Sequence, residues 1–218
     1  MEKEREELVD KLSRNGYIKT DQVKNAMLFV PREEFIPPEN RRYAYIDQPL
    51  PIGKGQTISA PHMVAMICET LDLKRGMKIL EVGSGFGYNA AVVAEIIGPE
   101  GHLFTTERIE SLAKSARDNL KRTGFDQCVT VLHTDGTKGL KEEAPFDRIY
   151  ATASAPKIPE PLKEQLKIGG RLLTPIGSRN HFQELICIVR LSENEYESRK
   201  LGGVAFVPMI GKHGWPEE

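Results

Sequence analysis

The sequence predicts an α/β fold: a doubly wound, mostly parallel sheet with an N-terminal helical cap and an antiparallel pair of strands near the C-terminus. Three observations support it. Apolar segments that fit strands begin near positions 77, 102 and 128, and a recurrence of about 25 residues suits right-handed strand–helix–strand units. A turn with three glycines follows the first of these segments. Two alternating apolar stretches come after the last of them.

The helical cap is expected in residues 1–38. Apolar residues at helical spacing predict one helix that Asn15-Gly16 ends, and a second that Thr20 or Asp21 caps and Pro31 terminates. A DNA-binding helix-turn-helix is the more specific alternative for these two helices. It would need a basic face, which this segment lacks.

Residues 41–56 are rich in proline and glycine and show no sustained period, so we expect a long loop there. A loop of this length inside a compact domain is usually functional. A helix should follow, with apolar residues at helical spacing from Met63 to Leu71. Ser59 fits its N-cap, and Pro61 fits its first turn, where the missing N–H costs nothing.

Strands and helices should alternate after position 76. We expect strands at 77–82, 102–107, 128–134, 146–152 and 171–176, and helices at 88–97, 109–123 and 160–166, the last stopped by Gly169-Gly170. The segments 182–191 and 201–210 then suit the antiparallel pair. Pro208 confines the second of them to an edge or to a strand end.

The composition is that of one globular domain. The 218 residues are 39% hydrophobic, enough to bury a full core. We divide them into N-terminal helices with the loop (1–56), an α/β core (57–180) and C-terminal strands with a tail (181–218). The net charge is −1, so we expect no nucleic-acid partner. A charged N-terminus and the lack of an apolar run of about 20 residues predict a cytoplasmic protein without a membrane partner, and we expect a monomer.

Cysteine and histidine give no sign of a disulfide framework or a metal site. Cys68, Cys128 and Cys187 are far apart and form no C-x-x-C pair. The histidines, His181 among them, show no ligand spacing. We therefore expect buried thiols and no metal.

The segment KILEVGSGFGYN at 78–89 has the pattern of a nucleotide-binding turn, because a strand that ends in an acid runs through alternating glycines into a helix. Glycine tolerates the sharp reversal and leaves no side chain between the main chain and a ligand. The glycines are Gly83, Gly85 and Gly87, spaced G-x-G-x-G, whereas the dinucleotide fingerprint is G-x-G-x-x-G. This spacing favours S-adenosylmethionine over NAD. An ordinary tight turn is the alternative.

Two further acids end neighbouring strands. Glu107 lies 20 positions after Gly87, where Rossmann-like sheets place the carboxylate that accepts both ribose hydroxyls. Without the glycines, Glu107 would as readily be a solvated strand end. Asp135-Gly136 ends the third strand, where an acid often points to the ligand; a simple tight turn is the alternative.

Four segments together resemble the protein-L-isoaspartate (D-aspartate) O-methyltransferases: QTISAPHM at 56–63, EVGSGFGYNAA at 81–91, Asp135-Gly136, and GGVAFVPMIG at 202–211. The resemblance covers nearly the whole chain, and TISAPHM makes it specific. It implies a Rossmann-like methyltransferase fold, S-adenosyl-L-methionine as cofactor with S-adenosyl-L-homocysteine as product, and damaged proteins with L-isoaspartyl residues as substrates. Acceptance of D-aspartyl sites stays open. The alternatives are a methyltransferase of small molecules or RNA, a non-catalytic nucleotide-binding module and a dehydrogenase.

The resemblance also implies roles for the residues that match the family's motifs. The cofactor-binding residues would be Glu81, Gly83, Ser84 and Gly85 in the loop, Glu107 at the ribose, and Asp135 and Gly136 near the adenine. The substrate-binding residues would be Thr57, Ile58 and Ser59 over the active site, with Ser59 as the catalytic residue, and Val204, Phe206 and Pro208 beside the peptide.

The implied chemistry needs no general base, because a carboxyl with a pKa near ~4 is already ionised at neutral pH. Positioning and exclusion of water should carry the reaction. Ser59 suits that task because its hydroxyl can donate to a carboxylate, although from the residues alone it could simply cap its helix. We expect His62 to be a packed or capping residue and Asp47 to order the long loop. Backbone docking of the substrate beside Gly202–Phe206 would sense the extra main-chain methylene of isoaspartate.

Overall fold

Helices and strands alternate through the middle of the chain, as the sequence predicts. The computed structural model describes residues 1–179 and 182–217, so the expected division between residues 180 and 181, and His181 itself, lie outside the described residues. The helices are α1 (Glu2–Arg14), α2 (Asp21–Phe29), α3 (Pro61–Leu71), α4 (Tyr88–Ile97), α5 (Glu110–Thr123) and α6 (Glu160–Glu164). The strands are β1 (Leu50–Gly53), β2 (Gln56–Ile58), β3 (Lys78–Val82), β4 (His102–Glu107), β5 (Val129–His133), β6 (Phe146–Ala151), β7 (Leu166–Gly177), β8 (Gln183–Arg190) and β9 (Tyr196–Val204). None of the helices in this described part has the length and apolar run needed to cross a bilayer.

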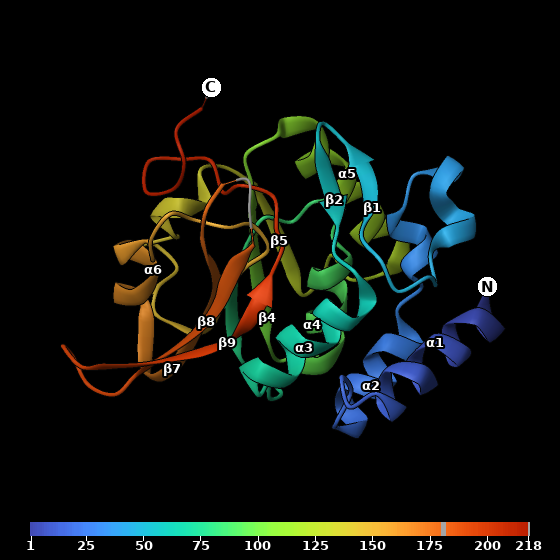
Figure 1. Cartoon of the computed structure of the whole chain (residues 1–218), viewed down its shortest axis with the longest axis horizontal. Helices are drawn as coiled ribbons and strands as arrows, with labels where there is room; N and C mark the ends of the chain where they lie inside the picture. The colour runs from blue at the N-terminus through green and yellow to red at the C-terminus, as the bar shows by residue number, and fades with distance from the viewer. Residues whose placement is uncertain (180–181, 218) are drawn as a thin grey trace.

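Seven strands form one sheet in the order β5-β4-β3-β6-β7-β8-β9 (Figure 1). The pairs from β5 to β7 are parallel, and β8 and β9 extend the sheet antiparallel at one edge. The doubly wound sheet with its antiparallel C-terminal pair is therefore confirmed. The strand order reverses between β3 and β6, and at such a reversal the loops after the two strands leave to opposite faces and open a crevice.

Two hydrophobic cores lie on the two faces of the sheet. Ile79 and Tyr150 belong to the core under α3, α4 and α5, whereas Leu80 and Ile149 belong to the core under α6. Successive strand residues alternate between the faces. Glu81 therefore lies on the side of α3 and α4.

The N-terminal cap, drawn in blue in Figure 1, lies on the side of the molecule away from α6. Thr20 caps α2 by accepting the N–H of Val23, as predicted. Glu69 of α3 accepts the backbone N–H groups of Lys19 and Thr20 over 2.8 and 2.9 Å. These bonds hold the start of α2 against α3, so that the segment after α2 reaches the N-terminal end of α3.

Residues 41–56 are not a plain loop, so the prediction for this segment is wrong. β1 and β2 form an antiparallel hairpin in which Leu50 lies opposite Ile58 and Pro51 opposite Thr57. The strands are too short, and too interrupted by proline and glycine, to show a period in the sequence. The hairpin carries Thr57 and Ile58 to the carboxyl edge of the sheet (Figure 1).

The C-terminal strands also differ from the prediction. α6 ends at Glu164, and β7 runs through Gly169-Gly170 instead of starting after them. The pairing of β6 with β7 shifts register next to these glycines, and Gly169 has a φ of +78°. They therefore bend a strand and do not end a helix. β9 covers residues 196–204 and not 201–210, because the chain leaves the sheet after Val204.

Residues 205–217 fold back across the end of the sheet. The N–H of Ser154, just beyond β6, donates to the Val207 carbonyl over 2.8 Å. The Ser154 carbonyl in turn accepts the N–H of Met209 over 2.8 Å and the indole N–H of Trp215 over 3.1 Å. This tail thus lies beside the loop that follows β6.

Candidate active site

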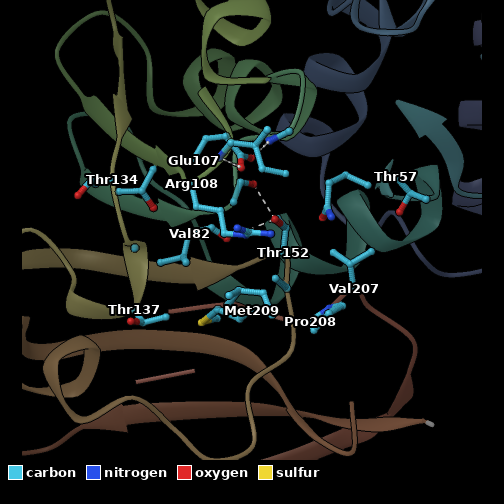
Figure 2. A pocket seen from close by; sticks show the side chains of 18 residues that line it. Thr57, Val82, Glu107, Arg108, Thr134, Thr137, Thr152, Val207, Pro208 and Met209 are labelled. Atoms are coloured by element: carbon cyan, nitrogen blue, oxygen red, sulfur yellow. Dashed lines mark hydrogen bonds between the residues drawn. The ribbon is translucent and has the colours of Figure 1, made fainter. Parts of the chain in front are cut away.

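A cavity with about 570 Å³ of empty space opens at the carboxyl ends of the parallel strands. Its lining includes Val82, Glu107, Thr134 and Thr152 from the ends of β3, β4, β5 and β6, and Val207, Pro208 and Met209 from the tail. Figure 2 shows Glu107 on one side of this cavity, Met209 and Pro208 on the other, and Thr57 at one end. Its place is that of a small-molecule site at the switch point of a doubly wound sheet.

The glycine turn after β3 leaves no room for side chains. Gly83 has a φ of +99°, and a Cβ on it would lie 2.5 Å from the hydroxyl oxygen of Thr152. That hydroxyl stays in place because it donates to the Gly83 carbonyl over 2.6 Å. The predicted reversal is confirmed, and it brings the backbone of Gly83 and Gly85 to the wall of the cavity.

Glu107 ties this turn to the end of β4. Its side chain is 7% exposed. One carboxylate oxygen accepts the N–H of Gly85 and the other that of Ile109, each over 3.0 Å. Burial raises the pKa of Glu107, and these hydrogen bonds partly oppose the shift. Each oxygen keeps a further acceptor site, so the carboxylate can also take two hydroxyl donors from a ligand in the cavity.

Asp135 and Gly136, after β5, take different places. Gly136 lines the cavity, and a side chain on it would meet the hydroxyl of Thr106. The Asp135 carboxylate instead accepts the N–H groups of Thr137 over 3.0 Å and Lys212 over 2.9 Å. Burial acts to raise the pKa of Asp135, but these bonds lower it overall. Asp135 therefore holds the tail beside the cavity, and its neighbour Gly136 lines the wall.

Glu81 lies beneath the glycine turn. Its side chain is fully buried, between Thr105 of β4 and Tyr150 of β6 in the sheet register. One carboxyl oxygen accepts the Thr105 hydroxyl over 2.5 Å, and the other has no hydrogen-bond partner among the described residues. Burial raises the pKa of Glu81 to about 7. The structure thus places this carboxyl behind the turn and not among the residues that line the cavity.

A second space, with about 350 Å³ of empty volume, adjoins the turn. Its lining includes Thr57, Ile58, Ser59, Ser84 and Gly85, all of them predicted site residues. Ser59 is not the N-cap of α3, because the helix begins at Pro61 with Ala60 at the cap position. The prediction of a cap is wrong here, since β2 ends at Ile58 and Ser59 falls in the gap. Its hydroxyl has no hydrogen-bond partner within the described part of the chain and is free to meet a ligand.

Asn89, in the first turn of α4, lines the same space and was not expected there. Its side chain is 7% exposed, and neither amide atom finds a partner among residues 1–179 and 182–217. Buried polar atoms are normally hydrogen-bonded, so this amide marks a position for a polar ligand group. The available signal is its place directly after the glycine turn, as the only amide side chain of the helix YNAAVVAEII.

A groove with about 780 Å³ of empty space, open solvent included, has Ser59 in its lining. Val204 and Phe206 also line it, whereas Pro208 lines the first cavity. Thr57 lines the cavity, the smaller space and the groove. The predicted substrate residues are thus brought together along a continuous surface, with Pro208 at its cavity end.

Thr152 and Val207 also line both cavity and groove, and the sequence did not single them out. Thr152 directly follows β6, and residues at that place in a parallel strand face the ligand crevice. Its position was therefore a usable signal. Val207 lies within the motif GGVAFVPMIG, but its place at the cavity follows only from the fold of the tail.

The doubly wound sheet, the glycine turn with its acidic neighbour and the cavity beside a groove fit an α/β methyltransferase, whose cofactor and methyl acceptor need adjoining sites. Residues 3–214 match the model of the protein-L-isoaspartate(D-aspartate) O-methyltransferase family. This chain belongs to that family and is an S-adenosylmethionine-dependent protein carboxyl methyltransferase.

Individual relatives agree with this assignment. A protein-L-isoaspartate O-methyltransferase of Methanothermobacter thermautotrophicus is 61% identical over 97% of both chains. One from Methanopyrus kandleri is 55% identical over 98% of this chain and 94% of its own. A solved Plasmodium falciparum protein-L-isoaspartate O-methyltransferase in complex with S-adenosyl-L-homocysteine superposes with a TM-score of 0.85 at 31% identity, covering 94% of this chain and 98% of that one. The resemblance seen in the sequence is confirmed.

The buried carboxyl of Glu81 predicts a specific pH dependence of stability. Between the ordinary glutamate pKa of about 4.3 and its raised value of about 7, the folded protein keeps a proton that the unfolded chain has lost. The free energy of unfolding should therefore fall as pH rises through this range, by on the order of 3 kcal/mol from this group. Glu81→Gln cannot ionise and should lack this slope. Urea unfolding of both proteins at pH 5, 6, 7 and 8 measures the difference, and parallel curves would contradict it.

Proposed function

We propose that this methyltransferase esterifies the free carboxylate of L-isoaspartyl residues in damaged proteins, with Ser59 directing the acceptor. The observation that carries the proposal is the junction at Thr57 and Thr152, which line both the cavity and the groove. The groove continues along residues 203–207, at the end of edge strand β9 and just beyond it, and an extended peptide can dock beside such a segment. Repair of aged proteins follows from this choice of substrate.

The residues of the cavity fit S-adenosylmethionine, which supplies an electrophilic methyl group on a sulfonium. The backbone of Gly83 and Gly85 would lie against its amino-acid portion, Glu107 would accept the ribose hydroxyls, and Gly136 would border the adenine. The free acceptor sites of Glu107 and the unpartnered amide of Asn89 support this fit. For Glu81 and Asp135, we propose supporting roles behind the turn and under the tail, in agreement with their hydrogen bonds.

The protein's own chemical task is to orient a group that is already reactive. An isoaspartyl carboxylate is ionised at neutral pH, so no side chain needs to remove a proton. We assign the Ser59 hydroxyl as a hydrogen-bond donor to one carboxylate oxygen, leaving the other to form the bond to the methyl carbon. Thr57 and Val207 line the junction, and displacement of water from the carboxylate there would favour attack.

Recognition of isoaspartate is best explained through the main chain. β9 is the edge strand of the sheet, and residues 202–206 lead from it along the groove. Gly202 and Gly203 have open space where side chains would stand. A substrate strand docked there could use backbone hydrogen bonds to measure register, and the extra methylene of isoaspartate would bring its carboxylate to Ser59.

We further propose that the protein acts as a cytoplasmic monomer without a nucleic-acid partner. Its three cysteines are free thiols, as suits a reducing compartment. Exposed large apolar side chains such as Phe29, Ile168 and Phe182 come from separate elements, which gives little basis for a permanent interface.

The first test compares matched peptides. With S-adenosylmethionine, a peptide containing L-isoaspartate should be methylated, and the same sequence with L-aspartate should not be, because only the former presents its carboxylate one methylene further along the main chain. Transfer of radiolabelled methyl measures both rates, and a D-aspartyl version tests that substrate. Equal methylation of the two L-peptides would overturn the proposed specificity.

Ser59→Ala should lower kcat on the isoaspartyl peptide by about 10- to 100-fold, since misorientation of a reacting group costs rates of that order. The dissociation constant of S-adenosylhomocysteine, measured by calorimetry, should stay nearly constant. Ser115→Ala, at a half-buried serine of α5 whose hydroxyl donates to the Ser111 carbonyl over 3.0 Å, is the matched control. An unchanged kcat in Ser59→Ala would remove Ser59 from the mechanism.

Glu107→Gln should instead weaken binding of the cofactor. A glutamine has one acceptor oxygen in place of two, so it cannot serve Gly85, Ile109 and two ribose hydroxyls together. We expect the dissociation constant of S-adenosylhomocysteine to rise about tenfold or more, at roughly 1.5–3 kcal/mol for a hydrogen bond to a charged group. Glu110→Gln, an exposed glutamate on the next helix, should leave it unaltered. Equal affinity for the Glu107 variant and the wild-type protein would refute the ribose assignment.

A further inference from the structure

Arg32 is a buried cation that lies outside every cavity described above. It opens the short 3-10 turn Arg32–Phe35 of the cap and has no exposed surface. Among the described residues it forms no ion pair with a carboxylate, and its Nη1 has no hydrogen-bond partner. Burial of an unpaired charge is costly, so this side chain calls for an explanation beyond packing.

The Arg32 guanidinium bridges two backbone carbonyls. Its Nε donates to Ala44 over 2.9 Å and its Nη2 donates to Ser59 over 2.8 Å. Its Cζ lies over the ring of Tyr88, 4.8 Å from the ring centroid. The Arg32 guanidinium is therefore held by two carbonyl oxygens and by the face of one aromatic ring.

The position of Ser59 depends on the hydrogen bond from Arg32, because Ser59 belongs to neither a strand nor a helix. β2 ends one residue before it, α3 begins two residues after it, and no side chain caps the helix. On the other side of the gap, Asp47 accepts both the backbone N–H of His62 over 2.9 Å and its ring Nδ1 over 2.8 Å. The segment 32–47, which runs from the end of the cap into the following loop, thus holds the chain on both sides of Ala60 and Pro61.

We propose that Arg32 is a positioning residue for methyl transfer: it fixes the Ser59 carbonyl from behind and thereby aims the Ser59 hydroxyl into the groove. This inference rests on the function of Ser59 proposed above. It assigns to the cap a part in catalysis, although no cap residue touches the reacting groups.

Arg32 acts through the geometry of its hydrogen bonds and not through its positive charge. Transfer of a methyl group from a sulfonium to a carboxylate consumes one positive and one negative charge. A fixed cation nearby therefore stabilises the ionised acceptor more than the transition state, and does not speed the chemical step. A lysine keeps the charge but lacks the planar fork that reaches both carbonyls. Arg32→Lys separates the two explanations.

The decisive experiment is a double-mutant cycle of Arg32→Lys and Ser59→Ala. With Ser59 present, Arg32→Lys should lower kcat on the isoaspartyl peptide about 10- to 100-fold. Affinity for S-adenosylhomocysteine by calorimetry should change less than about threefold, below 1 kcal/mol. In the Ser59→Ala background the same substitution should have no further effect, within about twofold, because both changes then act on one interaction.

A purely structural role for Arg32 gives different results. Arg148 is a matched control: it is 8% exposed, donates to the backbone carbonyls of Leu71 and Asp72, and lies at the other end of α3. Arg148→Lys should lower Tm and leave kcat unchanged at temperatures where the protein is folded. If Arg32→Lys behaves in the same way, or if its loss of kcat adds fully to that of Ser59→Ala, the proposal is overturned.

Two outcomes separate this proposal from the one on which it rests. Ser59→Ala with unchanged kcat would reject the role of Ser59, and the role of Arg32 with it. Ser59→Ala with reduced kcat and Arg32→Lys with unchanged kcat would reject Arg32 alone. If Arg32→Lys does not fold, Tyr88→Leu removes the ring face beneath the guanidinium and keeps its donors. It should lower kcat only when Ser59 is present, and an equal loss in both backgrounds would overturn the proposal.

Discussion

The hydrogen bond from the Gly85 N–H to the Glu107 carboxylate joins the two strand ends on which the cofactor cavity is built. A buried carboxylate is costly unless it is hydrogen-bonded, and the N–H groups of Gly85 and Ile109 meet that requirement. The same bonds fix the turn and leave each carboxylate oxygen with a further acceptor site at the wall of the cavity. The hydrogen bond between Gly85 and Glu107 therefore stabilises the turn and also fixes the position of the carboxylate.

Contacts between distant parts of the chain complete the other walls. Asp135 binds Lys212 of the tail, and Ser154 binds Val207 and Met209, so the tail closes one side of the cavity. The cap reaches Ser59 from the opposite direction. The ends of the sheet strands and the tail line the cavity, and the hairpin, Ser59 and the tail line the groove beside it. A fold shared by many methyltransferases can in this way carry an acceptor site of its own.

The sequence predicted features that depend on neighbours along the chain. The glycine turn at Gly83, the end of β4 at Glu107 and the cap of α2 at Thr20 follow from local backbone and side-chain chemistry. The junction residue Thr57 was found through the family motif and not through a local rule.

Features that depend on the tertiary structure were missed or misassigned. Strand pairing, which no short window reveals, decides the β1–β2 hairpin and the path of β7 through Gly169. Glu81 and Asp135 are recognisable as acids at strand ends, but the face of the strand and the return of the tail decide where their carboxyls point. The sequence also gives no hint that Arg32 contacts Ser59, 27 residues away.

The nature of the acceptor explains why so much of the site is scaffold. A carboxylate needs no activation by a base, so the protein can accelerate its methylation only by fixing its direction and removing its water. Both tasks demand rigidity more than special side-chain chemistry. Ser59 lies in a two-residue gap between β2 and α3, so neither element restrains the orientation of its side chain. Other groups must fix that orientation, and the buried guanidinium of Arg32, which donates to the Ser59 carbonyl, is the group that the fold places there.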